Sequence, residues 1–353
     1  MATWAFERCT ACVFSLAVAM LIAGIARADK PAHHISAEEA RQVPPLRLTE
    51  DLSIGVADPE TGPAFGRVVS IAVSAAGEIF VLDRGWYQVW VFSESGVPLR
   101  TISSRGEGPG EFSYPDYLAL GPRDRLYVVD GRKVKVYATS GEYLEEFPIE
   151  QARSFVRGMV VDDGGNLYLS SFNDADKQLI HKYGPDHEWI LSFCDSYFAG
   201  QDVDPRIERF SAGGSIDRAA NGNLLFAQAY PYELRVFSAA GELLQRMSRE
   251  TDFVALPEIE ITGDRTTYTS RGGCFGIVAL PSGAYLVTAN RLPSKEGDEG
   301  ETLVDCYGPQ GELLATQRRA GFFDIQCADS LGRVYATPFN EDYPRVVRYR
   351  VDW

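Results

Sequence analysis

Six repeats of one strand-and-turn pattern constrain the fold of this chain more than any other feature of its sequence. In a complete repeat an apolar run meets a short turn, a second apolar run ends on a polar residue, a loop follows, and two more runs flank a turn that usually contains Gly. The first turns are marked by Gly77, Asp124, Gly165, Gly222, Gly283 and Gly332, at intervals of 47, 41, 57, 61 and 49 residues. Intervals near 40–50 residues are typical of propeller blades with loop insertions. The sequence therefore predicts an all-β fold, a six-bladed β-propeller of four-stranded antiparallel blades.

The last repeat is one strand short, and the missing strand is found near the other end of the chain. Blade six provides only three runs before the chain ends at Trp353, whereas Leu46–Ile54 is strand-like and belongs to no repeat. We expect this N-terminal strand to complete blade six, because pairing both ends in one sheet closes the ring and covers an open edge. The predicted propeller domain is residues 46–353.

The first 45 residues differ in character from the repeats. Val13–Ile25 is an apolar stretch of thirteen residues, and Ala26-Arg27-Ala28 has the form of a cleavage site. A membrane span needs about 20 apolar residues. Residues 1–28 are therefore predicted to be a signal peptide, with a retained membrane anchor as the alternative, and residues 29–45 a flexible leader. The mature protein is expected in the periplasm or outside the cell, with no membrane span.

The net charge limits the partners that the chain can bind, and the cysteine spacing limits the metal or redox sites that it can form. With 34 basic and 49 acidic residues, the 353-residue chain has a formal net charge of −15, which argues against nucleic-acid binding. Four of the six cysteines lie in the propeller, namely Cys194, Cys274, Cys306 and Cys327. Four cysteines allow three pairings, and the sequence does not choose among them. None forms a C-x-x-C pair, so no zinc site or redox motif is indicated.

The segment from Gly106 to Phe112 reads G-E-G-P-G-E-F and is followed by Pro115. This segment resembles NHL-type repeats, and more closely those of exported bacterial six-bladed β-propeller proteins. It is not a phosphate-binding loop, because no strand-then-helix context surrounds it. The resemblance implies a propeller that acts mostly in binding.

One branch of such propellers is an amidating lyase with histidine zinc ligands. Only His181 and His187 lie in this propeller, and both are expected to be surface side chains.

The long loops of a propeller, which join the second to the third strand and the fourth strand to the next blade, emerge on one face. Aromatic, Arg, Asn and Asp residues gather in these loops, and such side chains suit stacking and hydrogen bonding to a polar ligand. The predicted ligand-binding residues are Trp86, Arg105, Asp116, Arg132, Arg157, Asn173, Tyr230, Arg271, Asn290, Phe323 and Asn340. We expect a funnel lined by Arg157, Arg271 and the aromatic rings.

Three functions remain open. The first is an exported module that binds a small polar ligand or a protein or peptide segment on the long-loop face. The second is a metal-dependent hydrolase of the lactonase type, which needs a Glu, an Asn and an Asp around one cation. The third is a structural subunit of an envelope assembly. No G-x-S-x-G motif and no His beside a loop Ser or Cys is found. We therefore favour binding over catalysis and assign no catalytic residue, cofactor or metal ligand.

Overall fold

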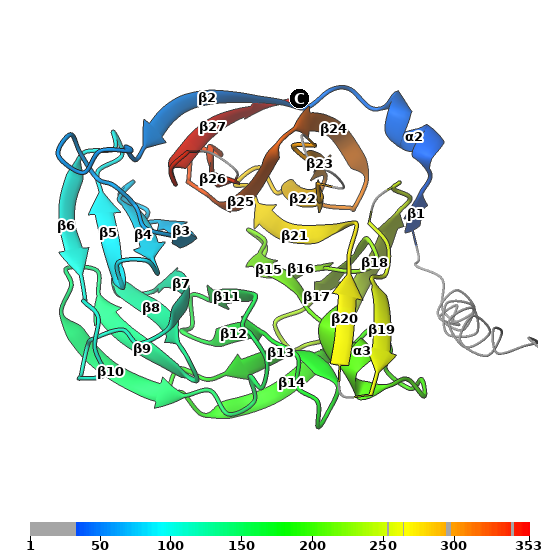
Figure 1. Cartoon of the computed structure of the whole chain (residues 1–353), viewed down its shortest axis with the longest axis horizontal. Helices are drawn as coiled ribbons and strands as arrows, with labels where there is room; N and C mark the ends of the chain where they lie inside the picture. Colours follow the sequence, from blue (N-terminus) through cyan, green and yellow to red (C-terminus); the bar gives the residue numbers. More distant parts are fainter. Residues whose placement is uncertain (1–32, 253, 264, 294–297, 340–341) are drawn as a thin grey trace, which may run out of the picture.

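The structure of the protein is a computed structural model that describes residues 33–353, except 253, 264, 294–297 and 340–341. The predicted signal peptide and Asn340 lie outside the described residues. Six blades, each of four antiparallel strands, are arranged around a common axis (Figure 1). The prediction of an all-β six-bladed propeller is confirmed.

Each of the first five blades is built from four consecutive strands. Blade one is β3 (Val68–Val73), β4 (Ile79–Asp83), β5 (Gln88–Phe92) and β6 (Pro98–Ile102); blade two is β7 (Pro115–Gly121), β8 (Arg125–Asp130), β9 (Lys133–Ala138) and β10 (Tyr143–Pro148); blade three is β11 (Gly158–Val161), β12 (Leu167–Ser170), β13 (Gln178–Tyr183) and β14 (Trp189–Asp195); blade four is β15 (Gly214–Arg218), β16 (Leu224–Gln228), β17 (Glu233–Phe237) and β18 (Leu243–Arg249); blade five is β21 (Gly272–Ala279), β22 (Tyr285–Arg291), β23 (Glu301–Tyr307) and β24 (Leu313–Ala320).

The first strand of every blade lies innermost. β3 contacts β7, β7 contacts β11, β11 contacts β15, β15 contacts β21, and β21 contacts β25 (Phe322–Ala328) of blade six, which returns to β3. The core lies between the facing sheets of neighbouring blades; for example, Phe80 and Leu82 of blade one pack in one cluster with Leu118 and Leu126 of blade two. Apolar residues on both faces of each sheet are thereby buried, which explains the weak alternation of the strands.

Blade six draws its strands from both ends of the chain. β2 (Arg47–Ile54) pairs antiparallel with β27 (Val346–Asp352), and the sheet continues through β26 (Val334–Phe339) to β25. Figure 1 shows β2 lying along the outside of β27. The outermost strand of the last blade is therefore the N-terminal strand that the sequence predicts.

The described part of the predicted flexible leader is folded. β1 (His33–Ile35) pairs in parallel with β18 at the outer edge of blade four, and α2 (Ala37–Gln42) follows it. Ser36 caps α2 in a capping box with Glu39, in which each side chain accepts a hydrogen bond from the backbone N–H of the other residue. The helix is six residues long, too short to produce a readable helical period, and this is why the sequence did not indicate it.

Replacing the cap residue Ser36 tests whether residues 33–45 are folded in this way. We expect Ser36→Ala to lower the free energy of unfolding by about 1 kcal/mol, because the N–H of Glu39 loses its acceptor. Urea denaturation measures the change, and Ser330→Ala, in an exposed turn, is the control. A change no larger than that of the control would show that residues 33–45 do not pack as described.

Two insertions carry structure that belongs to no blade. α3 (Pro205–Ser211) lies between blades three and four, and the hairpin of β19 (Glu258–Thr262) and β20 (Arg265–Thr269) lies between blades four and five. The Arg206 guanidinium donates a hydrogen bond to the carbonyl of Gly263 at 3.3 Å, so the helix and the hairpin contact each other. These insertions account for the two longest repeat intervals.

All four propeller cysteines are free thiols. Cys194, Cys274 and Cys306 are buried, and burial raises the pKa of Cys194 to about 11 and that of Cys306 to about 12. Among the described residues, none of the helices has the length and apolar character that a bilayer crossing requires.

Candidate functional site

In blades one and two, the aspartate that ends the second strand holds a loop of the long-loop face in place. Asp83, at the end of β4, accepts hydrogen bonds from the backbone N–H groups of Gly66 and Arg67, both at 2.8 Å. Asp130, at the end of β8, accepts from the N–H groups of Ser113 and Tyr114. Because a buried carboxylate needs such partners, each aspartate holds the loop that leads into its own blade.

The loop held by Asp130 lines part of a cavity of about 740 Å³, which we call the arginine pocket. It is lined by five arginines, one carboxylate and two aromatic rings, together with smaller residues. These side chains are Arg132, Arg153, Arg157, Arg206, Arg209, Asp116, Tyr114 and Phe155. The pocket thus draws on the loops that lead into blades two, three and four, and its remaining lining includes Thr266 of the β19–β20 hairpin.

Helix α3 places two of the arginines. Asp204 caps the helix and Pro205 occupies its first turn, which suits a helix start. Glu208 is buried and accepts hydrogen bonds from Ser196 at 2.5 Å and from Lys177 at 2.6 Å, so it ties the helix to blade three. Arg206 and Arg209, three residues apart, share a face of the helix, and both line the pocket.

Arg157 reaches the pocket by passing over a glycine. Its backbone N–H donates to the carbonyl of Ser170 at 2.8 Å, which fixes the loop beside blade three. A Cβ atom on Gly213 would lie 2.8 Å from the Cδ and Nε atoms of Arg157, and Gly213 has a φ of +135°. A larger residue at position 213 would therefore displace the arginine and strain the backbone.

The pocket carries an excess of positive charge in a protein of net charge −15. Its one carboxylate, Asp116, already forms an ion pair with Arg84. Arg206 pairs with Asp204 at 2.9 Å, and Arg153 lies 3.6 Å from Asp174. Within the described part of the chain, the remaining three arginines form no ion pair. These are Arg132, Arg157 and Arg209, and their guanidinium groups are available for an anionic ligand.

The structure brings together three of the predicted ligand-binding residues, Asp116, Arg132 and Arg157. Three others lie exposed elsewhere on the loops. Trp86 is 57% exposed, and its indole N–H donates to the carbonyl of Ala64. Arg105 lies over the ring of Tyr87, and Arg271 is 78% exposed, 3.7 Å from Glu258. Of the two arginines expected to line a funnel, Arg157 lines the arginine pocket and Arg271 does not.

Four further predicted residues are buried and serve the packing of the loops and blades. The amide of Asn173 bonds to Gln151 and to the N–H of Ala175. Tyr230 packs edge-on against Tyr268 and Phe275. Phe323 lies in the core cluster between blades five and six, under the guanidinium of Arg319. Asn290 is fully buried, and its side-chain oxygen accepts from Thr302 at 2.7 Å.

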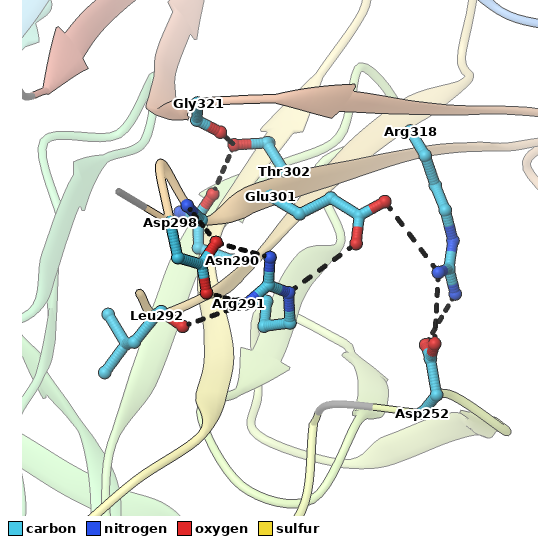
Figure 2. Close-up of polar contacts among 10 residues, drawn as sticks. Asp252, Asn290, Arg291, Leu292, Asp298, Glu301, Thr302, Arg318 and Gly321 are labelled. Atoms are coloured by element: carbon cyan, nitrogen blue, oxygen red, sulfur yellow. Dashed lines mark hydrogen bonds and ion pairs between the residues drawn. The ribbon is translucent and has the colours of Figure 1, made fainter. Parts of the chain in front are cut away.

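Figure 2 shows the polar network that surrounds Asn290. Thr302 also contacts the carbonyl of Gly321, and the neighbouring Arg291 forms two hydrogen bonds with Asp298, at 2.8 and 2.9 Å. Glu301 lies between Arg291 and Arg318, at 3.7 and 3.9 Å. Asp298 and Glu301 thus neutralise Arg291 and Arg318 of blade five.

The inner strands place two carboxyl groups beside the central axis. Asp217 lies on β15 and Asp324 on β25. Burial raises the pKa of Asp217 to about 6, although hydrogen bonds from the N–H groups of Ala279 and Arg218 oppose the shift. Burial raises the pKa of Asp324 to about 7, and its Oδ1 has no hydrogen-bond partner among the described residues.

Burial also raises the pKa of Tyr117 on β7, and the charges of Asp324 and Asp217 act in the same direction, so the three groups lie near one another. No cluster of three or more His, Cys, Asp or Glu side chains suited to a metal ion occurs among the described residues.

The expectation that both propeller histidines lie at the surface is wrong for His181. It is fully buried between Ser192 Oγ and the carbonyl of Ser171, each at 2.8 Å, and burial lowers its pKa. His187 occupies the β13–β14 turn at a φ of +67° and stacks on Phe147 at 4.0 Å. Position 187 is thus the turn position that glycine takes in most repeats.

Sequence comparison gives one family match. The model of the DUF5128 family, described as a 6-bladed beta-propeller, matches residues 64–184, which span blades one and two and three strands of blade three. No curated protein matches the chain.

Solved structures cover nearly the whole propeller at low identity. A DUF4221-family protein of Bacteroides vulgatus is 10% identical, with 88% of this chain and 99% of that chain covered and a TM-score of 0.60. A protein of Bacteroides fragilis that is inferred to be exported is 12% identical, with coverage of 91% and 99% and a TM-score of 0.56. A streptogramin B lyase is 12% identical, with coverage of 87% and 97% and a TM-score of 0.51. At these identities the likeness concerns the fold alone. The chain is therefore a six-bladed β-propeller, similar in fold to these Bacteroides proteins.

Proposed function

We propose that this protein is an exported binding protein that captures an anionic small ligand in the arginine pocket. The observation that carries the proposal is the set of three arginines without an ion-pair partner among the described residues, in a cavity of about 740 Å³. A pocket of this size is typical of small-molecule sites. Guanidinium groups bind carboxylate, sulfate or phosphate oxygens through paired hydrogen bonds.

The rings of Tyr114 and Phe155 give the pocket apolar surface as well as charge. Tyr114 is 47% exposed and Phe155 is 70% exposed, so both rings can cover the carbon skeleton of a ligand. The backbone of Tyr114 is held by Asp130, and its ring lies 4.8 Å from the guanidinium of Arg84. One wall of the site is therefore already ordered in the free protein.

Removal of single arginines tests the proposal. Calorimetric titration with citrate, inorganic phosphate and acidic oligosaccharides should detect binding that weakens as salt is added, because the attraction is electrostatic. We expect Arg157→Ala and Arg209→Ala each to weaken binding about tenfold, since a charge-assisted hydrogen bond contributes about 1.5–3 kcal/mol.

Arg271→Ala is the matched control, because it removes an exposed arginine that does not line the pocket. Its affinity should equal that of the unchanged protein. Failure of every anion to bind, or an equal effect of all three substitutions, would contradict the proposal.

A further inference from the structure

A second cavity adjoins the arginine pocket. Its volume is about 680 Å³, and Arg132 and Arg153 line both cavities. We call it the outer cavity; its other lining residues include Lys133, Glu150 and Asp174. Because Arg132 and Arg153 line both cavities, the two cavities are adjacent. A ligand that fills the arginine pocket can therefore extend past these two side chains into the outer cavity.

The two cavities differ in the balance of their charges. The arginine pocket holds five arginines and a single carboxylate that is paired with Arg84. The outer cavity holds two carboxylates beside three cationic side chains, with Arg153 lying 3.6 Å from Asp174. Carboxylates accept hydrogen bonds from hydroxyl groups, whereas guanidinium and ammonium groups donate to them. The outer cavity therefore suits a neutral, hydroxyl-rich group better than a second anion.

From this arrangement we infer that the two cavities form one cleft for an acidic oligosaccharide. The anionic sugar unit occupies the arginine pocket, where Phe155 and Tyr114 can pack against its ring, and a neighbouring unit binds through its hydroxyls in the outer cavity. A single phosphate or carboxylate ion would use only the first cavity. This inference rests on the proposed function, because it assigns the ligand class of the same pocket.

The length dependence of binding tests the inference. Galacturonate, glucuronate and mannuronate, and trimers that join one of these acidic units to two neutral sugar units, are titrated into the full mature chain by calorimetry, with maltotriose as a neutral trimer. In at least one series the trimer should bind at least tenfold more tightly than its monomer, and maltotriose should not compete.

Substitution of Glu150 separates the two cavities. Glu150 lines only the outer one, so Glu150→Ala should reduce trimer affinity to the monomer level and leave monomer affinity unchanged. Glu142→Ala, at an exposed position in the β9–β10 turn, is the matched control and should change neither affinity.

The outcomes distinguish the two proposals. If no sugar and no inorganic anion binds, the anion-binding function fails and the inference fails with it. If monomers or inorganic phosphate bind but every trimer binds no more tightly, or Glu150→Ala leaves trimer binding intact, the anion-binding function stands and the oligosaccharide inference is overturned. Binding of maltotriose, or of an acidic peptide such as triglutamate, more tightly than every acidic trimer would also overturn it.

Discussion

Replacing Asp305 by alanine should lower the free energy of unfolding by about 3–5 kcal/mol, because removal of one partner from a buried ion pair leaves the other charge uncompensated. Asp305 on β23 is fully buried and forms an ion pair with Arg249 of blade four, which is also buried. It accepts further hydrogen bonds from Tyr232 at 2.7 Å and Thr316 at 2.6 Å. Burial acts to lower the pKa of Arg249, but the charge of Asp305 outweighs it and the pKa is raised.

Urea denaturation of Asp305→Ala gives the size of this effect, with Asp252→Ala as the control. Asp252 also pairs with an arginine, Arg318, at 2.6 Å, but its side chain is 67% exposed, so its loss should cost no more than about 1 kcal/mol. Asp305→Asn keeps an acceptor and should be less damaging than alanine. Equal losses at positions 305 and 252 would show that Asp305 is not the hub that joins blades four and five.

The second large effect is a fall in stability as pH rises from about 4 to about 7. A carboxyl whose folded pKa lies above its unfolded value binds its proton more tightly in the folded protein, so the free energy of unfolding decreases as pH rises between the two values. The pKa of Asp324 rises from 3.8 to about 7 and that of Asp217 from 3.8 to about 6. At about 1.4 kcal/mol per pH unit, Asp324 alone contributes on the order of 4 kcal/mol.

His181 changes the free energy of unfolding in the opposite direction over part of the same pH range. Its pKa is lowered in the folded protein, so its contribution is present near neutral pH and is lost as pH falls below about 6.5. The measurement therefore compares the unchanged protein with Asp324→Asn by urea denaturation at several pH values. Relative to the unchanged protein, the free energy of unfolding of the variant should increase by about 2–4 kcal/mol between pH 4.5 and pH 8. A difference that stays constant over this range would exclude Asp324 as the titrating group.

The strands could be predicted because the same strand-and-turn pattern recurs from blade to blade. The Gly turns fix where the strands of a blade separate, and the missing strand of blade six points to Leu46–Ile54, which pairs with β27 as expected. The helix α3 and the β19–β20 hairpin could not be found in this way, because each occurs once and has no counterpart in another blade. The two longest repeat intervals were the only signal of them.

Some of the predicted ligand-binding residues line the arginine pocket and others do not, and the difference has a physical pattern. Arg132 and Arg157 lie in loops between blades and reach the pocket, whereas Arg206 and Arg209 were missed because they lie on the unpredicted helix. Asn290 lies one residue before the end of the second strand of blade five, close to the position at which Asp83 and Asp130 hold loops in blades one and two. A position next to the loop-holding aspartates favours a structural role. Residue type and nearness to a loop do not by themselves distinguish an amide that stabilises the fold from one that binds a ligand.

The pairing of β2 with β27 has a consequence for biogenesis. Residues 47–54 leave the ribosome or the export channel long before residues 346–352, yet the two segments must meet to finish the same sheet. Blades one to five can assemble in order as they emerge, whereas the sixth requires the longest loop closure in the molecule. Until that step is complete, the edge of β27 is exposed to pairing with another chain. The interval before ring closure is thus when association with other chains competes most strongly with folding.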